Sequence, residues 1–267
     1  MKFRIIMTVI IISMSILQGC SALNFNVGPK KEVRAYSEKI LSVEQPLELE
    51  IKSDFSNTEI YGWDKYEVKF EITKKVRGIQ DKKVLAEKLE DFDINISQNV
   101  NKVEFKSEYK GSIKSPADKS VDLRVFIPRK TKFMVFALGV GSMKFYDDIK
   151  GELKITMDMA NIEVNKFEGA IKVDGNMGNF KIGNGKISGD SHVIVKAGNI
   201  SIKAAHEENK SFRYETDIGN VDLLLPVSSK ISIETIGTLE VNEFAKSANT
   251  GKVTAISKMG KISIKKY

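Results

Sequence analysis

The feature that most constrains the fold of this chain is a short motif that recurs about every twenty residues. In each copy a small residue is followed by apolar residues at the second and fourth positions, and the seven copies begin at Gly141, Ala160, Gly178, Gly198, Gly219, Gly237 and Gly260. Successive copies begin 19, 18, 20, 21, 18 and 23 residues apart. A period kept over seven copies is typical of repeat proteins, in which each unit buries its apolar side only by stacking on its neighbours.

The phase of the apolar residues indicates what each repeat does. The residue before the small one is also apolar in most copies, so that Ile218 and Val221 are three positions apart and strict alternation breaks once, at Gly219. A strand that keeps its apolar side inward absorbs such a slip by turning a corner, for which glycine supplies the backbone freedom. Weaker copies begin about halfway between, at Gly151 and Gly169. The sequence therefore predicts a β-solenoid or β-roll of about 20-residue repeats.

A column of asparagines follows the predicted corners. The same position is occupied by Asn161, Asn179, Asn199 and Asn220. Asparagine suits turn geometry, and stacked amides form ladders between strands, although a ligand-binding column is the alternative. The segment 55–60 fits the same template with Ser56 in place of glycine, which indicates that the N-terminal half is a degenerate part of the same fold.

The N-terminal half also alternates with a period of two. Apolar residues alternate with polar ones over 47–51 and 68–72. Over 121–127 they alternate with Asp122, Arg124 and Phe126, and Pro128 ends that run. These are strands with one buried face. A helical spacing occurs only over 81–92, where Leu85, Leu89 and Phe92 lie on one face. The fold class is therefore all-β with one short helix in the N-terminal half.

The first twenty residues predict export. Lys2 and Arg4 precede an apolar run over 5–16, which is too short to span a bilayer and is typical of a secretory signal. The run leads to Leu17-Gln18-Gly19-Cys20, and Cys20 is the only cysteine of the chain. This segment resembles the lipobox of bacterial lipoproteins, with Leu17 and Gly19 at its fixed positions. The resemblance implies a diacylglycerol and palmitate anchor on Cys20; an ordinary signal peptide with an incidental cysteine is the alternative.

These patterns divide the chain into three parts. We expect a signal peptide over 1–19, the lipidated cysteine and a tether over 20–35, and a single β-repeat domain over 36–267, with the clearest repeats in 139–267. Removing the signal leaves 40 basic and 35 acidic residues, a net charge of +5. The lysine pairs are scattered rather than gathered in a stripe, which argues against nucleic acid and favours solvated faces, with weak attraction to anionic envelope polymers as the alternative.

The whole layout resembles a known family. A lipoprotein signal, a strand-rich opening, a short helix, a strand ending in Pro128 and serial glycine-led repeats are similar to the bacterial putative-adhesin family of β-strand-repeat proteins, a domain of unknown function, over roughly 36–267. The resemblance implies a β-solenoid or β-roll, an extracytoplasmic location and no established catalytic residues. It also implies association with envelope-stress systems in some members.

Residues suited to chemistry are few. One cysteine and two histidines leave no basis for a metal site, and His192 and His206 are expected at the surface or in turns. Asp222 and Glu240 fall at the outward position of successive repeats, where an enzyme acting on glycans needs two neighbouring carboxyls, but a charged solvent face is the simpler interpretation. No catalytic residue, metal ligand or cofactor other than the lipid on Cys20 is predicted.

One aromatic cluster is the candidate ligand contact. Tyr61, Trp63 and Tyr66 lie between two predicted strands, where they either stack on a ligand or cover the end of a hairpin. The sequence thus predicts a non-catalytic binding or scaffolding module, held at the outside of the bacterial cell membrane by its lipid. Its expected partners are the bilayer and an envelope polysaccharide or another envelope protein, but not nucleic acid. A regulatory accessory in envelope stress, acting through a membrane partner, is the alternative.

Overall fold

The structure is a computed structural model that describes residues 29–44, 46–244 and 251–267, except the side chain of residue 130. Within these ranges the chain forms one large mixed sheet and one short α-helix, which confirms the predicted all-β class. The first half contains β1 (Lys31–Ser42), β2 (Leu47–Trp63), β3 (Glu67–Gly78), α2 (Lys82–Glu87), β4 (Phe92–Asn99), β5 (Lys102–Tyr109), the 3-10 turn η2 (Pro116–Asp118) and β6 (Lys119–Pro128). The second half contains β7 (Lys130–Gly169), β8 (Ile171–Met177), β9 (Phe180–Ile187), β10 (Ser191–Ala197), β11 (Ile200–Lys203), β12 (Ala205–His206), β13 (Ser211–Ile218), β14 (Val221–Leu225), β15 (Ser232–Asn242) and β16 (Lys252–Lys266).

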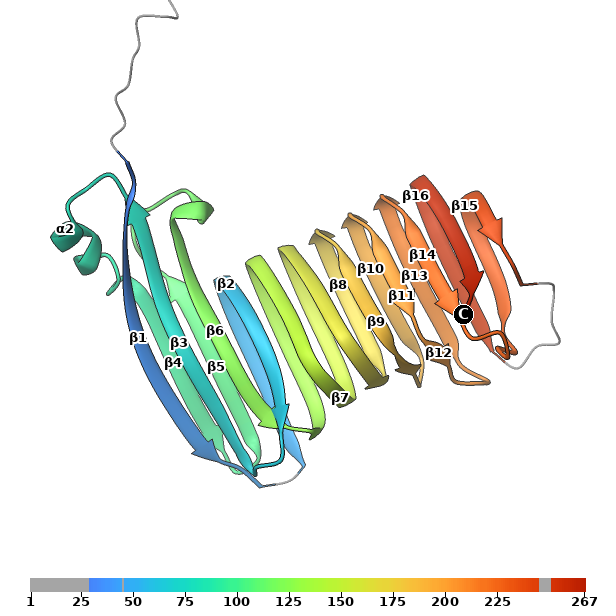
Figure 1. The fold of residues 1–267 in the computed structure, drawn as a ribbon, viewed down its shortest axis with the longest axis horizontal. Helices are drawn as coiled ribbons and strands as arrows, with labels where there is room; N and C mark the ends of the chain where they lie inside the picture. The colour runs from blue at the N-terminus through green and yellow to red at the C-terminus, as the bar shows by residue number, and fades with distance from the viewer. Residues whose placement is uncertain (1–28, 45, 245–250) are drawn as a thin grey trace, which may run out of the picture.

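Figure 1 shows the strands stacked side by side along the long axis, with β1 to β6 at one end and β15 and β16 at the other. Two runs of parallel strands make up most of the stack. Run A passes through β5, β2, β7, β8, β10, β13, β16 and β15. Run B passes through β6, β2, β7, β9, β11, β14, β16 and β15. β1 and β3 extend run B antiparallel, and β4 extends run A antiparallel.

The glycine-led repeats link the two runs. Gly178 leads from β8 in run A to β9 in run B, and Gly198 and Gly219 make the equivalent links in the next two repeats. At Gly178 φ is +129°, and a Cβ atom added there would lie 1.8 Å from the carbonyl oxygen of Ala160 in the previous repeat. The corner therefore combines a backbone angle that favours glycine with a backbone approach that leaves no room for a side chain.

The N-terminal half joins this register as the template predicted. Ser56 pairs with Gly141, and the residues after them pair in step as far as Ile60 and Phe145. The apolar residues of both runs, including Ile51, Val125, Ile155 and Val164, are buried in one hydrophobic cluster. β2 thus pairs in register with the first clear repeat, although Ser56 does not share the positive φ of Gly141.

Besides the start of β1, three details differ from the prediction. The α-helix ends at Glu87, and the amides of Leu89 and Phe92 bond carbonyls three residues back, so the chain tightens into turns and Phe92 opens β4. All three residues of the predicted apolar face are nevertheless buried. β1 begins at Lys31 and takes up residues 31–35 of the predicted tether, because they pair with β3 and bring Val33 against the core.

The order of the last two repeats is the second difference. β16, which carries Gly260, lies between β13 and β15, so the later copy is inserted before the earlier one. The third difference concerns the apolar residue before each corner, whose side chain was expected to point into the core. Met177 and Ile218 are exposed, because at the end of each run A strand the chain turns away from the core.

Candidate functional site

The outer face of run B carries three rows of side chains that cross the strands. The first row is the amide column. The side-chain oxygen of Asn161 accepts hydrogen bonds from the backbone and side-chain nitrogens of Asn179, both at 3.0 Å. Asn199 bonds Asn179 in the same way, and the backbone nitrogen of Asn220 bonds Asn199 at 2.9 Å. These oxygens are occupied within the protein, which favours the predicted structural ladder over a ligand column.

The second row consists of charges of alternating sign. Arg124 on β6 donates to Glu59 on β2 at 2.9 Å, and farther along Glu163 on β7 lies between Lys144 at 3.3 Å and Lys181 at 3.1 Å. The hydrogen bonds from Lys181 and Lys144 lower the pKa of Glu163. Adjacent opposite charges of this kind neutralise one another and form a solvated face, as expected from the outward positions of the repeats.

The third row is aromatic and contains two of the three predicted residues. Tyr61 stacks on Phe126 of β6 at 5.1 Å between ring centroids and on Tyr146 of β7 at 4.8 Å. Trp63 lies 5.4 Å from Phe126 and donates from Nε1 to the carbonyl of Glu67 at 2.8 Å. We call Trp63, Phe126, Tyr61 and Tyr146 the aromatic row.

The geometry of the aromatic row decides what it presents to solvent. The Tyr61 and Tyr146 rings are within 2° of parallel, so their facing sides are occupied by one another. Tyr146 ends the stack and is 38% exposed, with the ammonium of Lys144 5.0 Å from its ring centroid. Because that ammonium lies over the ring, the exposed part of Tyr146 is where a ligand would meet an aromatic ring and a cation together.

Glu59 connects the aromatic row with the charged row. Its carboxylate accepts from the Tyr61 hydroxyl at 3.0 Å and from the Tyr146 hydroxyl at 3.3 Å. Burial, reinforced by Glu59, raises the pKa of Tyr61 to about 12, and the same carboxylate raises the pKa of Arg124. These contacts fix the rings in place before any ligand binds.

A hollow of about 350 Å³ adjoins the rows on the β1, β3 and β6 side. Its lining includes Arg34, Tyr36, Glu59, Lys75 and Arg124, so cations, carboxylates and a tyrosine converge there. A larger hollow of about 630 Å³ lies over run A, where Ala137 and Gly139 form part of its wall with Lys52, Lys106 and Lys196. Of the two, the smaller hollow shares Glu59 with the aromatic row.

Tyr66, the third predicted residue, lies in the bend just before β3 and is 72% exposed. It is not one of the stacked rings among the described residues. Phe126 and Tyr146 were not predicted as members of the aromatic cluster. For Phe126 the signal was present, because it occupies the outward position in an alternating strand whose other outward residues are Asp122 and Arg124. Leu17, Gly19 and Cys20 lie outside the described residues.

The remaining candidates are separated by the fold. Asp222 pairs with Ser263 of β16, and β15, which carries Glu240, lies on the other side of β16. The two carboxyls are therefore not on neighbouring strands, and Glu240 instead bonds Lys261 at 2.8 Å. Among the described residues no group of three or more His, Cys, Asp or Glu is placed to hold a metal ion. In the same part of the chain no helix is both long and apolar enough to cross a bilayer.

Comparison with known proteins places putative adhesins among the solved structures that this chain resembles. A putative cell adhesion protein from Clostridium sporogenes ATCC 15579 is 15% identical, covering 88% of this chain and 100% of that one, with a TM-score of 0.36. A putative adhesin from Parabacteroides distasonis ATCC 8503 is 12% identical, covering 87% and 97%, with a TM-score of 0.45. A putative lipid binding protein from the same organism is 10% identical, covering 87% and 96%, with a TM-score of 0.31.

These neighbours agree with the putative-adhesin resemblance of the repeats. No family model matches the chain, and no curated protein matches it.

Proposed function

We propose that this chain is a non-catalytic binding module of the bacterial cell surface, and that the aromatic row is where it holds an anionic envelope polysaccharide. The carrying observation is the 38% exposed Tyr146 ring at the end of the aromatic row, with the Lys144 ammonium over it and the hollow lined by Arg34, Lys75 and Arg124 joined to the row through Glu59. Aromatic rings stack on sugar rings, while lysine and arginine pair with carboxylate or phosphate substituents.

The supporting architecture is proposed to be a β-solenoid. Parallel pairing in both runs, corner glycines stacked on the previous repeat, and the amide ladder all suit successive turns of one coil. Such a scaffold is rigid and presents regularly spaced side chains along an extended surface, which fits a long polymer better than a small substrate.

Anchorage completes the proposal. The lipobox-like segment ending at Cys20 supports export, acylation and attachment to the outer side of the cell membrane. A diacylglycerol with a further acyl chain gives durable attachment, at about 0.8 kcal/mol for each buried CH₂. A non-catalytic role is supported by the separation of Asp222 from Glu240 by β16.

Tyr146→Ala is expected to weaken binding of an anionic envelope polysaccharide about tenfold, because removing an aromatic anchor costs on the order of 1–2 kcal/mol of binding free energy. The test is an affinity measurement against a panel of bacterial envelope polysaccharides, with neutral dextran as the uncharged reference. Tyr66→Ala is the matched control, since Tyr66 is an exposed tyrosine outside the aromatic row.

Two results would count against the aromatic row. The first is unchanged affinity in Tyr146→Ala while circular dichroism shows an intact fold. The second is an equal loss in Tyr66→Ala, which would indicate a general surface effect.

A further inference from the structure

A ladder of exposed apolar side chains runs along one edge of the stack. Met159 pairs with Met177, Met177 with Ala197, Ala197 with Ile218, and Ile218 with Met259, so one member stands on each successive strand of run A. The exposed fractions are 50% for Met159 and Met177, 56% for Ile218 and 68% for Met259. We call these five residues the apolar ridge.

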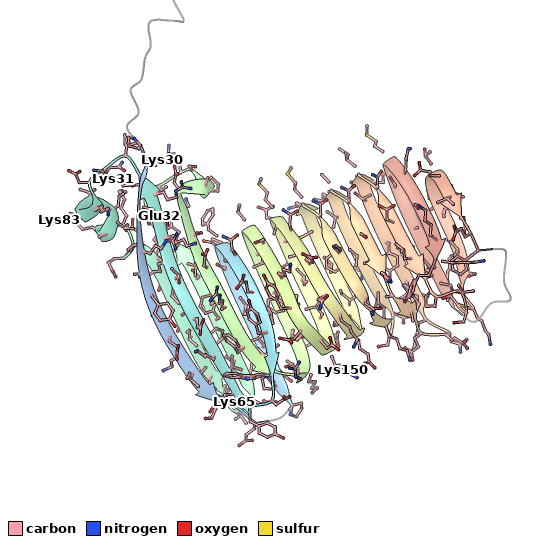
Figure 2. The ribbon with its side chains drawn as sticks, viewed as in Figure 1. Lys30, Lys31, Glu32, Lys65, Lys83 and Lys150 are labelled. Carbon is pink, nitrogen blue, oxygen red and sulfur yellow. The ribbon has the colours of Figure 1, made fainter. Side chains whose placement is uncertain are left out.

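The apolar ridge contributes little to the core. The neighbouring inward residues Val173, Val195, Tyr214 and Ala255 are buried, whereas the ridge residues follow them at the corner and project past the edge of the core. Figure 2 shows sulfur-bearing side chains standing clear of the upper edge of the ribbon. Single exposed apolar residues are ordinary, but a contiguous exposed row marks a contact surface.

The same edge receives the chain from its N-terminus. Lys30 and Lys31 lie at the upper edge in Figure 2, where β1 begins, and Lys83 of α2 is beside them. Exposed Lys82 and Lys83 lie in α2 with exposed Val84, and Ile79 just before the helix is also exposed. Lysines next to apolar side chains are the composition that favours the surface of an anionic bilayer.

We infer that the apolar ridge and the lysines around α2 form a membrane-resting edge, on which the protein lies against an anionic bilayer. This inference rests on the proposed anchorage, because the tether determines which edge meets the lipid. Nine residues lie between Cys20 and Lys30, and the ten steps from one to the other reach at most about 35 Å when fully extended. An acylated Cys20 would therefore hold this edge close to the bilayer.

The arrangement also orients the binding surface. Lys65, two residues after Trp63, lies at the lower edge in Figure 2, opposite Lys30 and Lys31. With the apolar ridge on the bilayer, the Trp63 end of the aromatic row faces away from the membrane. The bilayer is favoured over a second copy as the occupant because the N-terminal entry and the lysines share this edge.

The test uses the full lipidated chain reconstituted on vesicles of phosphatidylcholine and phosphatidylglycerol. Cys20 is the only native cysteine, so once it is acylated, Met177→Cys or Ile218→Cys supplies a unique thiol for an environment-sensitive fluorophore. Lys150→Cys is the control, because Lys150 is exposed at the lower edge in Figure 2. Vesicle flotation of the unlabelled chain, with Cys20→Ala as its control, reports anchorage separately.

We expect labels at 177 and 218 to shift to shorter emission wavelengths on vesicles and to be quenched by lipid-borne quenchers, while the label at 150 stays unchanged. Flotation without a shift at 177 and 218 would overturn the membrane-resting edge and leave the anchorage standing. Neither flotation nor a shift would overturn both. A shift that already occurs without vesicles and grows with protein concentration would assign the apolar ridge to a second copy and overturn the inference.

Discussion

Gly178→Ala is expected to destabilise the fold by more than about 4 kcal/mol, or to prevent folding altogether. The added Cβ atom would lie 1.8 Å from the Ala160 carbonyl oxygen, and φ at this position is +129°. Relief requires this repeat to separate from the previous one, which would also break the hydrogen bond from the Ile162 nitrogen to the Asn179 carbonyl at 2.8 Å. Urea unfolding followed by circular dichroism measures the change in the free energy of unfolding.

Gly62→Ala is the matched control. A Cβ atom at Gly62 meets only side-chain atoms, the nearest being Cβ of Asp147 at 3.3 Å and Cγ of Arg129 at 3.4 Å. We expect this variant to stay within about 1 kcal/mol of the wild type, because those side chains have room to adjust. Equal stability of the two variants would show that the corners do not depend on close backbone stacking.

Stability is expected to fall by about 1 to 2 kcal/mol between about pH 7 and about pH 5 because of His206. His206 Nε2 lies 2.5 Å from the hydroxyl of fully buried Tyr214, and its Nδ1 lies 3.2 Å from the Ala204 carbonyl. A neutral ring satisfies both contacts, with Nδ1 donating and Nε2 accepting. His206 lies in β12, is half-buried and precedes a turn, so the expectation of a surface or turn residue holds only in part.

The sign follows from the pKa of His206. Burial lowers it from 6.5 to about 4, so the unfolded chain binds a proton that the folded chain resists as the pH falls below 6.5. Its contribution to stability is therefore fully present above that value and is lost toward about pH 4. His206→Gln should flatten the slope of unfolding free energy against pH, whereas His192→Gln, which changes the other histidine, should keep it. An identical slope in His206→Gln and the wild type would contradict this account.

Local rules explain what could be predicted from the sequence. The corner at each glycine, the strand phase on either side and the ladder from Asn161 to Asn220 depend on residues within one repeat or at equal positions in neighbouring repeats. The same template identified 55–60 as a further copy, and the structure pairs its Ser56 with Gly141. Periodicity is sufficient for such features because every repeat meets its neighbours in the same way.

The repeat pattern does not predict the order in which the repeats stack, so features that depend on this order could not be predicted. The copies at Gly237 and Gly260 have the same local motif, so nothing in either one specifies that β16 is inserted beside β13. Asp222 and Glu240 were wrongly predicted to lie on neighbouring strands because the repeats were assumed to stack in chain order. The aromatic row was predicted only in part for the same reason, since Phe126 and Tyr146 reach Tyr61 from strands on either side of β2.

The proposed ligand surface contains its own reporter, because Trp63 is the only tryptophan in the chain. Its fluorescence, titrated with an anionic envelope polysaccharide, therefore measures events at the aromatic row without any label. If the aromatic row binds the polymer, Trp63 emission should change saturably. The midpoint of the titration should be about tenfold higher in Tyr146→Ala and unchanged in Tyr66→Ala. Retention of the same polymer by the protein in a pull-down, with no change in Trp63 emission at saturation, would contradict binding at the aromatic row.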